Sequence, residues 1–289
     1  MNPDFPNITI LGGGLLGGSL ARALAVLENP PQVRLWARRQ ETATAAAELG
    51  IQNCTIDLAE AVRDASLLVL AVPVGSMADL VSASLKAGLP DDCLITDVGS
   101  VKRTPHREIG RVLKDQKIHF IGSHPMAGSE RNGLAAVTVD LFKNAACLLT
   151  NDSGAPAAQA AALERFWNTI GCRTSWMSAA IHDELVARIS HLPHLIAASA
   201  ARVCLKDPSE SRFGGGGLRD TTRVAAGNPV MWAEIVIENR EALIGPLNEA
   251  IADLREILAA LEAGDQEHAR RWLVTAKQKR EPITPSHLA

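Results

Sequence analysis

The sequence contains no tyrosine, and aromatic residues make up only 3% of its 289 residues. A tyrosine general acid, a tyrosine nucleophile and a tyrosine stacking platform for nucleic acid are therefore excluded. An excess of either charge is also lacking, because 29 Lys and Arg stand against 32 Asp and Glu, which gives a net charge of -3. Proteins that bind nucleic acid or anionic membranes usually carry a basic excess, so we expect neither partner.

Paired cysteines and long apolar runs are missing as well. The five cysteines are scattered and never form a C-x-x-C pair, which predicts neither a disulfide framework nor a zinc site. No run approaches the roughly 18 apolar residues of a membrane span. Apolar residues still make up 47% of the chain, enough for a packed core. We expect a soluble, cytoplasmic protein.

The first part of the chain alternates short apolar runs with helical patterns, which is typical of a mostly parallel α/β sheet. Two of the helices are expected at Leu15–Leu27 and Met77–Lys86. The expected strands are Ile8–Leu11, Val33–Trp36, Leu67–Val72, Leu94–Asp97, His119–Gly122, Cys147–Thr150 and Thr174–Met177.

From residue 178 onward nearly every segment has helical periodicity. Helices are expected at Ala180–Leu205, Pro229–Leu261 and Gln266–Lys279. The breaks between them fall at Asp207–Gly217, which contains four consecutive glycines, and at Gly264. The sequence therefore predicts an α/β domain over residues 1–177 and an all-helical domain over residues 178–289.

A glycine-rich turn with the pattern G-x-G-x-x-G follows the first expected strand and opens a helix. The first glycine allows a tight turn, the second lets the backbone approach a pyrophosphate, and the third permits close packing of helix on strand. This context predicts a dinucleotide site, and a turn of purely structural use is the alternative. The expected cofactor residues of this turn and of a nearby strand end are Gly12, Gly14, Leu15, Leu16, Gly17 and Val72.

The end of the second expected strand indicates which dinucleotide binds. An NAD site would carry Asp or Glu here for the ribose 2′-hydroxyl, but this sequence has Ala37 followed by Arg38 and Arg39. Guanidinium groups bind a 2′-phosphate through two hydrogen bonds, whereas a carboxylate would repel it. We therefore predict NADP in preference to NAD. The alternative is that both arginines are ordinary solvated charges.

Several further segments carry polar groups in a specific order along the chain. They are Asp97–Lys102, Gly122–Glu130, Ser190–His194, Gly214–Arg223, Pro229–Trp232 and Glu238–Asn239. Together with the glycine-rich turn, they resemble the prephenate/arogenate (cyclohexadienyl) dehydrogenase family of tyrosine biosynthesis over most of the chain. The resemblance implies a Rossmann-type domain followed by a helical domain that forms a homodimer. It also implies oxidative decarboxylation of arogenate and/or prephenate.

The resemblance implies that His124 is the catalytic histidine, and we expect it to accept the proton of the substrate 4-hydroxyl. Ser100 is expected to hydrogen-bond the same hydroxyl or the histidine. Both residues should follow strands, and ligands of α/β sheets bind outside the carboxyl ends of the strands. A structural histidine and a helix N-cap serine are the alternatives. Lys102 is expected either to steer anions or to be a solvated charge.

Arg223 is the expected carboxylate clamp, because a planar guanidinium binds a carboxylate through two hydrogen bonds. Asp220 is expected to orient Arg223 or to cap a helix, and a surface ion pair is the alternative for both. The other expected substrate-lining residues are His191, His194, Gly216, Trp232 and Glu130. For the last three, a flexible loop, a core tryptophan and a surface charge are the respective alternatives. The two histidines have no evident third ligand nearby, so no metal is expected.

Two other function classes stay open. A β-hydroxyacid-dehydrogenase-like NADP oxidoreductase would share the two-domain plan, but it would carry a lysine early in the long interdomain helix, and residues 182–204 contain none. A non-catalytic NADP-binding sensor would keep the glycine-rich turn without any need to combine Ser100, His124 and Arg223.

Overall fold

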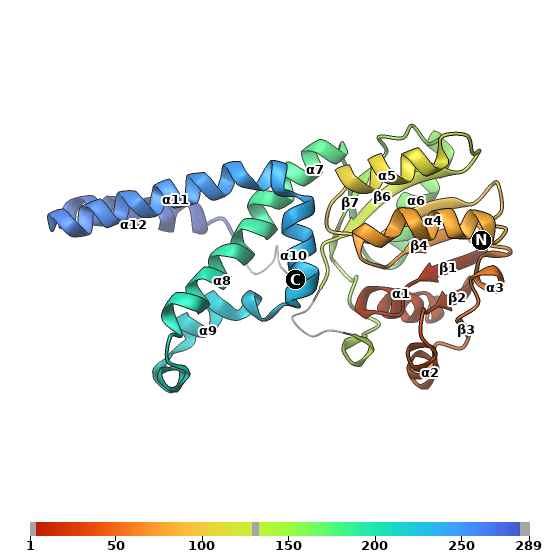
Figure 1. The fold of residues 1–289 in the computed structure, drawn as a ribbon, viewed down its shortest axis with the longest axis horizontal. Coiled ribbons are helices and arrows are strands. Elements are labelled where there is room, and N and C mark those ends of the chain that lie inside the picture. Colours follow the sequence, from red (N-terminus) through yellow and green to blue (C-terminus); the bar gives the residue numbers. More distant parts are fainter. Residues whose placement is uncertain (1–3, 129–132, 284–289) are drawn as a thin grey trace. The chain divides into compact units, whose positions relative to one another are not determined.

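The computed structural model describes residues 4–128 and 133–283 (Figure 1). Its first part alternates strands and helices along the chain. In chain order these are β1 (Asn7–Leu11), α1 (Leu15–Ala25), β2 (Gln32–Trp36), α2 (Gln40–Glu48), β3 (Cys54–Thr55), α3 (Leu58–Val62), β4 (Leu67–Leu70), α4 (Met77–Lys86), β5 (Leu94–Asp97), α5 (Arg103–Leu113), β6 (His119–Pro125), β7 (Ala146–Thr150), α6 (Ala157–Thr169) and β8 (Arg173–Trp176).

The described strands form one eight-stranded sheet in the order β3-β2-β1-β4-β5-β6-β7-β8. The first six pair in parallel, β7 is antiparallel to β6, and β8 is parallel to β7. The order 3-2-1-4-5-6 is that of the doubly wound dinucleotide-binding fold, whose ligands bind at the carboxyl ends of the strands where the order reverses. The glycine-rich turn after β1 lies at this reversal.

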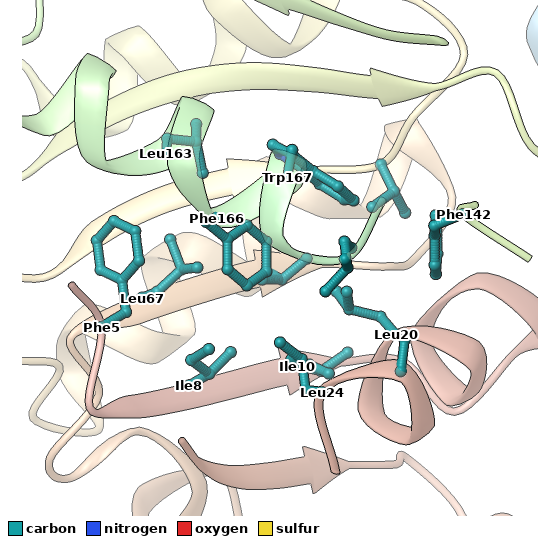
Figure 2. Close-up of a cluster of buried hydrophobic side chains, with 14 of the residues drawn as sticks. Phe5, Ile8, Ile10, Leu20, Leu24, Leu67, Phe142, Leu163, Phe166 and Trp167 are labelled. Carbon is teal, nitrogen blue, oxygen red and sulfur yellow. The ribbon is translucent and has the colours of Figure 1, made fainter. Parts of the chain in front are cut away.

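Apolar side chains on both faces of the sheet hold the two layers of helices in place. Ile8 and Ile10 of β1 pack on one face with α1 and α6, whose Trp167 is fully buried (Figure 2). Leu68 and Leu70 of β4 point to the other face, which α3, α4 and α5 cover. Burial of one such large side chain contributes about 1.5–3 kcal/mol, so the three layers are stabilised mainly by this apolar packing.

β6 continues through Pro125, beyond the end that the sequence predicts at Gly122. Its first residues pair with β5, and the segment from Gly122 to Pro125 pairs with β7 instead. The strand is longer than expected because a second neighbour supplies hydrogen-bond partners where β5 ends. His124 therefore lies inside a strand and not after one.

The helical part begins with α7 (Ala179–Val186), a π-helical turn (Ala187–His191) and α8 (Leu192–Cys204). The sequence predicts one helix over Ala180–Leu205 with Pro193 inside it, and not these three segments. Pro193 explains the difference, because it has no N–H to donate to a carbonyl one turn earlier and its ring crowds that carbonyl. A π-turn before the proline is one way for a helix to absorb this disturbance. Two further helices follow, α9 (Gly216–Thr222) and α10 (Pro229–Glu238).

The chain divides after Asn239 into two compact units. The first contains the sheet, its helices and α7 to α10; the second contains α11 (Arg240–Ala263) and α12 (Gln266–Arg280). The continuous helix expected at Pro229–Leu261 is therefore wrong, because Asn239 leaves helical geometry and buries its side chain. The domain boundary expected near residue 177 stays a prediction. Among the described helices, none is long and apolar enough to cross a membrane.

Candidate active site

The glycine-rich turn has the shape that a pyrophosphate requires. Gly12 has a φ of 124°, and a Cβ atom there would collide with the carbonyl oxygen of Ala71, which follows β4. A Cβ atom on Gly17 would collide with the carbonyl oxygen of Gly12, whereas the space beside Gly14 is open. Gly14 is also the N-cap of α1 without a side-chain cap, so the first amides of the helix are available to an anion. The turn fits a dinucleotide phosphate.

The other expected cofactor residues lie beside this turn or at the end of β2. Leu15 and Leu16 are the first residues of α1, and Cγ1 of Val72 lies 3.1 Å from where a Cβ atom on Gly12 would stand. Arg38 and Arg39 follow β2, and both are exposed. Within the described part of the chain, neither guanidinium has an ion-pair partner, so both charges are available to a phosphate at this strand end.

A chain of hydrogen bonds links α7 to β6. Oδ1 of Asp183 lies 2.8 Å from Nδ1 of His182, and Nε2 of His182 lies 2.9 Å from Nδ1 of His124. All three side chains are buried. Ser178 caps the first turn of α7, and the pairing of β6 with β7 fixes the strand that carries His124. The chain therefore connects two well-anchored elements.

Asp183 anchors this chain at the start of α5. Its carboxylate accepts hydrogen bonds from the backbone N–H groups of Lys102 (2.7 Å) and Arg103 (2.9 Å), which have no partner inside the helix. Burial alone would raise the pKa of Asp183, but the hydrogen bonds from His182 and these two amides hold it below its ordinary value. Asp183 is thus an ionised cap of α5, and the N-cap role considered for Ser100 is wrong.

The charge on Asp183 determines which nitrogens carry protons. An ionised carboxylate only accepts, so His182 donates from Nδ1 and accepts at Nε2. His124 therefore donates from Nδ1, and its lone pair is on Nε2. Burial lowers the pKa of His124 well below its ordinary value, and a proton on His182 and the charge of Lys102 would lower it further. Burial also lowers the pKa of His182, against the opposite effect of Asp183. His124 is a neutral imidazole that can accept a proton at Nε2.

Lys102 is fully buried, which corrects both expectations for it. Its Nζ donates to Oδ2 of Asp97 (2.6 Å) and to the carbonyl oxygens of Gly99 (2.8 Å) and Val101 (3.1 Å). An ammonium group has three protons, and these partners use all of them. Lys102 is therefore neither solvated nor available to steer an anion, and it fixes the segment between β5 and α5.

Asp97 joins this segment to β6. Its Oδ1 accepts from the backbone N–H of Ser123 (3.0 Å), and its Oδ2 accepts from that of Gly99 (2.9 Å). Ser100 follows directly after Gly99 and is half-buried, and His124 follows directly after Ser123. One buried carboxylate thus holds the backbone next to each of the two residues expected to be catalytic.

A second polar cluster lies on the π-turn, α8 and α10. Nδ2 of Asn239 lies 2.9 Å from Nδ1 of His191, and the ring of His194 stacks on Trp232 with 3.6 Å between centroids. Burial lowers the pKa of His191 to about 4 and also lowers that of His194. Within the described residues, Nε2 of His191 and Nδ1 of His194 are buried without a hydrogen-bond partner. Such atoms are rare in proteins and are suited to contact a ligand. Protonation of His191 would lower the pKa of His124 further, so the two clusters are close enough to interact electrostatically.

The remaining expected substrate residues lie on exposed segments. Gly216 begins α9, so the flexible loop considered for it is wrong at this position. Asp220 lies on α9 and pairs with the neighbouring Arg219 at 3.1 Å. Arg223 is exposed and begins a 3₁₀ turn that packs against α8. Glu130 lies outside the described residues. In the part of the chain that the structure describes, no group of three His, Cys, Asp or Glu residues is placed to hold a metal.

Sequence reasoning misses the residues that orient the histidines. It assigns no role to His182, Asp183 or Asn239. The only local signal for the first two is an adjacent His–Asp pair in an apolar helical segment, and Asn239 is a polar residue in a run that reads as one long helix. Their function depends on contacts with residues 48 to 81 positions away in the chain.

Two family models match the chain: "Prephenate dehydrogenase, nucleotide-binding domain" over residues 20–176 and "Prephenate dehydrogenase, dimerization domain" over residues 178–275. A cyclohexadienyl dehydrogenase of Zymomonas mobilis is 35% identical over 289 residues, with 98% of both chains covered. A prephenate dehydrogenase of Bacillus subtilis is 33% identical, with 98% of this chain and 77% of that protein covered.

A likeness to solved structures agrees with these matches. The prephenate dehydrogenase of Aquifex aeolicus, solved in complex with hydroxyphenyl propionate and NAD+, has a TM-score of 0.88 at 26% identity. The match covers 98% of this chain and 100% of that chain. The expected α/β class, with a Rossmann-like domain and a helical domain, is confirmed.

Proposed function

This chain belongs to the prephenate/arogenate (cyclohexadienyl) dehydrogenase family of oxidoreductases, and on that premise we propose that it oxidises and decarboxylates arogenate and/or prephenate with NADP. The observation that carries the proposal is the hydrogen-bond chain from Asp183 through His182 to His124. A reaction that begins with removal of a hydroxyl proton needs a neutral base, and this chain presents one at His124 Nε2.

The proposed cofactor is NADP in preference to NAD. The glycine-rich turn would hold its pyrophosphate, and Arg38 and Arg39 would bind its 2′-phosphate. Ala37 supports the preference, because it stands where a carboxylate would select the free 2′-hydroxyl of NAD. When bound, the nicotinamide ring accepts a hydride.

The proposed substrate is a cyclohexadienol with a hydroxyl at C4 and a carboxylate on the opposite ring carbon. His124 Nε2 accepts the hydroxyl proton as the C4–H bond breaks and its electron pair leaves as hydride. The bond to the carboxylate then breaks, its electron pair enters the ring, and carbon dioxide departs. The resulting phenolate takes the proton back from His124. Aromaticity supplies the driving force, so the protein mainly aligns the substrate and accepts a proton.

Neighbouring residues support this base. Asp183 and His182 stabilise the cationic form of His124 while it holds the proton, as the carboxylate of a catalytic triad does. Ser100, whose segment Asp97 and Lys102 fix, is proposed to hydrogen-bond the substrate hydroxyl or His124.

The substrate's carboxylates require cationic or neutral donors. We assign Arg223 as the clamp for one of them and Asp220 as the residue that orients it. The buried nitrogens of His191 and His194 support their role as lining residues. The other lining residues of the proposal are Gly216, Trp232 and Glu130.

A homodimer is the assembly we propose. Several apolar side chains of α11 and α12 are exposed, among them Ile244, Leu254, Leu261 and Leu273. A surface of this kind favours association, because burying apolar area contributes about 25 cal/mol per Å². The match to a dimerization-domain model supports a second copy of this chain as the partner.

A steady-state assay of prephenate and arogenate, each with NADP and with NAD, tests the proposal. We expect release of carbon dioxide and reduced cofactor with at least one substrate, and a higher kcat/KM for NADP. His124→Asn should lower kcat by about 10²-fold or more, because it removes the base. Binding of NADP without turnover of either substrate by the wild type would contradict the proposal and indicate a cofactor sensor.

A further inference from the structure

Asn239 follows α10, and its buried side chain connects two other segments. Its Nδ2 lies 2.9 Å from the backbone carbonyl oxygen of Asp183 and 2.9 Å from Nδ1 of His191. A carbonyl oxygen can only accept, so the amide nitrogen has to face Asp183, and its second proton is directed at His191. Nδ1 of His191 therefore accepts, and the proton of this neutral imidazole is on Nε2.

Nε2–H of His191 is consequently a buried donor. The side chain is fully buried, and within the described residues no acceptor lies in hydrogen-bond range of this nitrogen. A buried donor without a partner is unfavourable, so the position is suited to a ligand atom with a lone pair. The same position would repel a group that itself presents a proton, such as an ammonium.

Asp183 sets the proton positions of both clusters. Its carboxylate acts through His182 and makes His124 an acceptor at Nε2. Its backbone carbonyl acts through Asn239 and makes His191 a donor at Nε2. The two imidazoles therefore have opposite polarity at Nε2, an acceptor on His124 and a donor on His191.

We propose that Asn239 is a positioning residue that fixes His191 as a hydrogen-bond donor, and that Nε2 of His191 binds a substrate oxygen bearing a lone pair, such as a carboxylate oxygen. The identity of the substrate rests on the proposed function above. The tautomer of His191 does not, because it follows from contacts within the protein alone.

The tautomer is measured by 15N NMR of the full-length protein labelled in histidine, since protonated and unprotonated imidazole nitrogens have well-separated shifts. His191→Gln identifies the His191 signals by their loss. We expect Nδ1 of His191 to be unprotonated and Nε2 to be protonated in the wild type at neutral pH. A protonated Nδ1 would overturn the proposal.

Two substitutions at the same position test the role of Asn239. Asn239→Leu removes the donor and should give a mixture of His191 tautomers. Asn239→Asp replaces the donor with an acceptor of the same shape and should move the proton to Nδ1. Unchanged His191 shifts in both variants would show that Asn239 does not set the tautomer.

A double-mutant cycle separates this role from a general structural one. Asn239→Leu should raise the substrate KM by about tenfold with a smaller change in kcat, and leave the Kd of NADP unchanged. In a His191→Gln background, where the amide supplies its own donor, Asn239→Leu should raise KM little further. An equal rise in both backgrounds would contradict the proposal. If the wild type turns over neither substrate, the proposed function fails, but the NMR experiment still decides the tautomer.

Discussion

The residues that hold protons in this site are arranged around a single carboxylate. Asp183 caps α5, orients His182 and, through its backbone, anchors Asn239. A histidine can donate from either nitrogen, and its partners decide which one carries the proton. Since these hydrogen bonds from four other residues converge on Asp183, the tautomers of the site are set before any substrate binds. The protein then has little reorganisation left to do when the reaction begins.

His182 is expected to act through the tautomer of His124. His182→Leu leaves Nδ1–H of His124 without an acceptor, and we expect kcat to fall by about 10²–10⁴-fold, as when a catalytic histidine loses the partner that orients it. His182→Gln is the matched control, because its amide oxygen can take the acceptor position. This variant should lose less kcat than the leucine variant. Equal losses would show that His182 only fills space.

Arg38 is expected to select the cofactor. Arg38→Ala would remove the charge-assisted hydrogen bond that we propose to the 2′-phosphate, which is worth about 1.5–3 kcal/mol. The kcat/KM for NADP should therefore fall by about 10- to 100-fold, while that for NAD changes little. Arg63→Ala is the control, because Arg63 is an exposed arginine that follows α3. A wild type that uses both cofactors equally would contradict this role.

The elements differ in how far the sequence predicts them. β1, the glycine-rich turn and α1 follow from local patterns, since a glycine at φ 124° and an apolar run leave few alternatives. The break at Asn239 and the burial of Lys102 do not, because each depends on partners that only the folded chain brings near. At Asn239 and Lys102, hydrogen bonds that form only in the folded chain outweigh the helical or exposed state that the local sequence favours. The partners of His124 in the hydrogen-bond chain, His182 and Asp183, escape sequence reasoning for the same reason, and the catalytic role expected for His124 stays a prediction.

α10 is expected to hold the loop after β4. Oε1 of Glu234 on α10 accepts from the backbone N–H of Gly75 at 2.6 Å, and this loop also carries Val72 beside the glycine-rich turn. Glu234→Leu removes the acceptor, worth about 0.5–1.5 kcal/mol, so the Kd of NADP should rise by about two- to tenfold. Glu234→Gln keeps an acceptor and should bind NADP nearly as the wild type does. Isothermal titration measures both, and an unchanged Kd in the leucine variant would exclude this contribution.

At the scale of the whole molecule, burial of neutral histidines makes stability depend on pH. Burial is the largest cause of the lowered pKa values of His106, His124, His182, His191 and His194. Each imidazole stays neutral in the folded protein but takes up a proton in the unfolded chain below the ordinary value of 6.5. The unfolded state therefore binds more protons as the pH falls, and it is stabilised relative to the folded state.

These histidines should therefore leave the free energy of unfolding unchanged above about pH 7 and should lower it below pH 6.5. Each group contributes a slope of about 1.4 kcal/mol per pH unit down to its folded pKa, which for His191 is about 4. His191→Gln should reduce the slope between pH 6.5 and 4 by that amount, as measured by urea unfolding across this range.

Because the pKa of His124 is lowered well below 6.5, kcat should stay constant while stability declines, so that unfolding and not protonation of the base limits activity in acid. A loss of kcat near pH 6.5 in fully folded protein would contradict the neutral buried base.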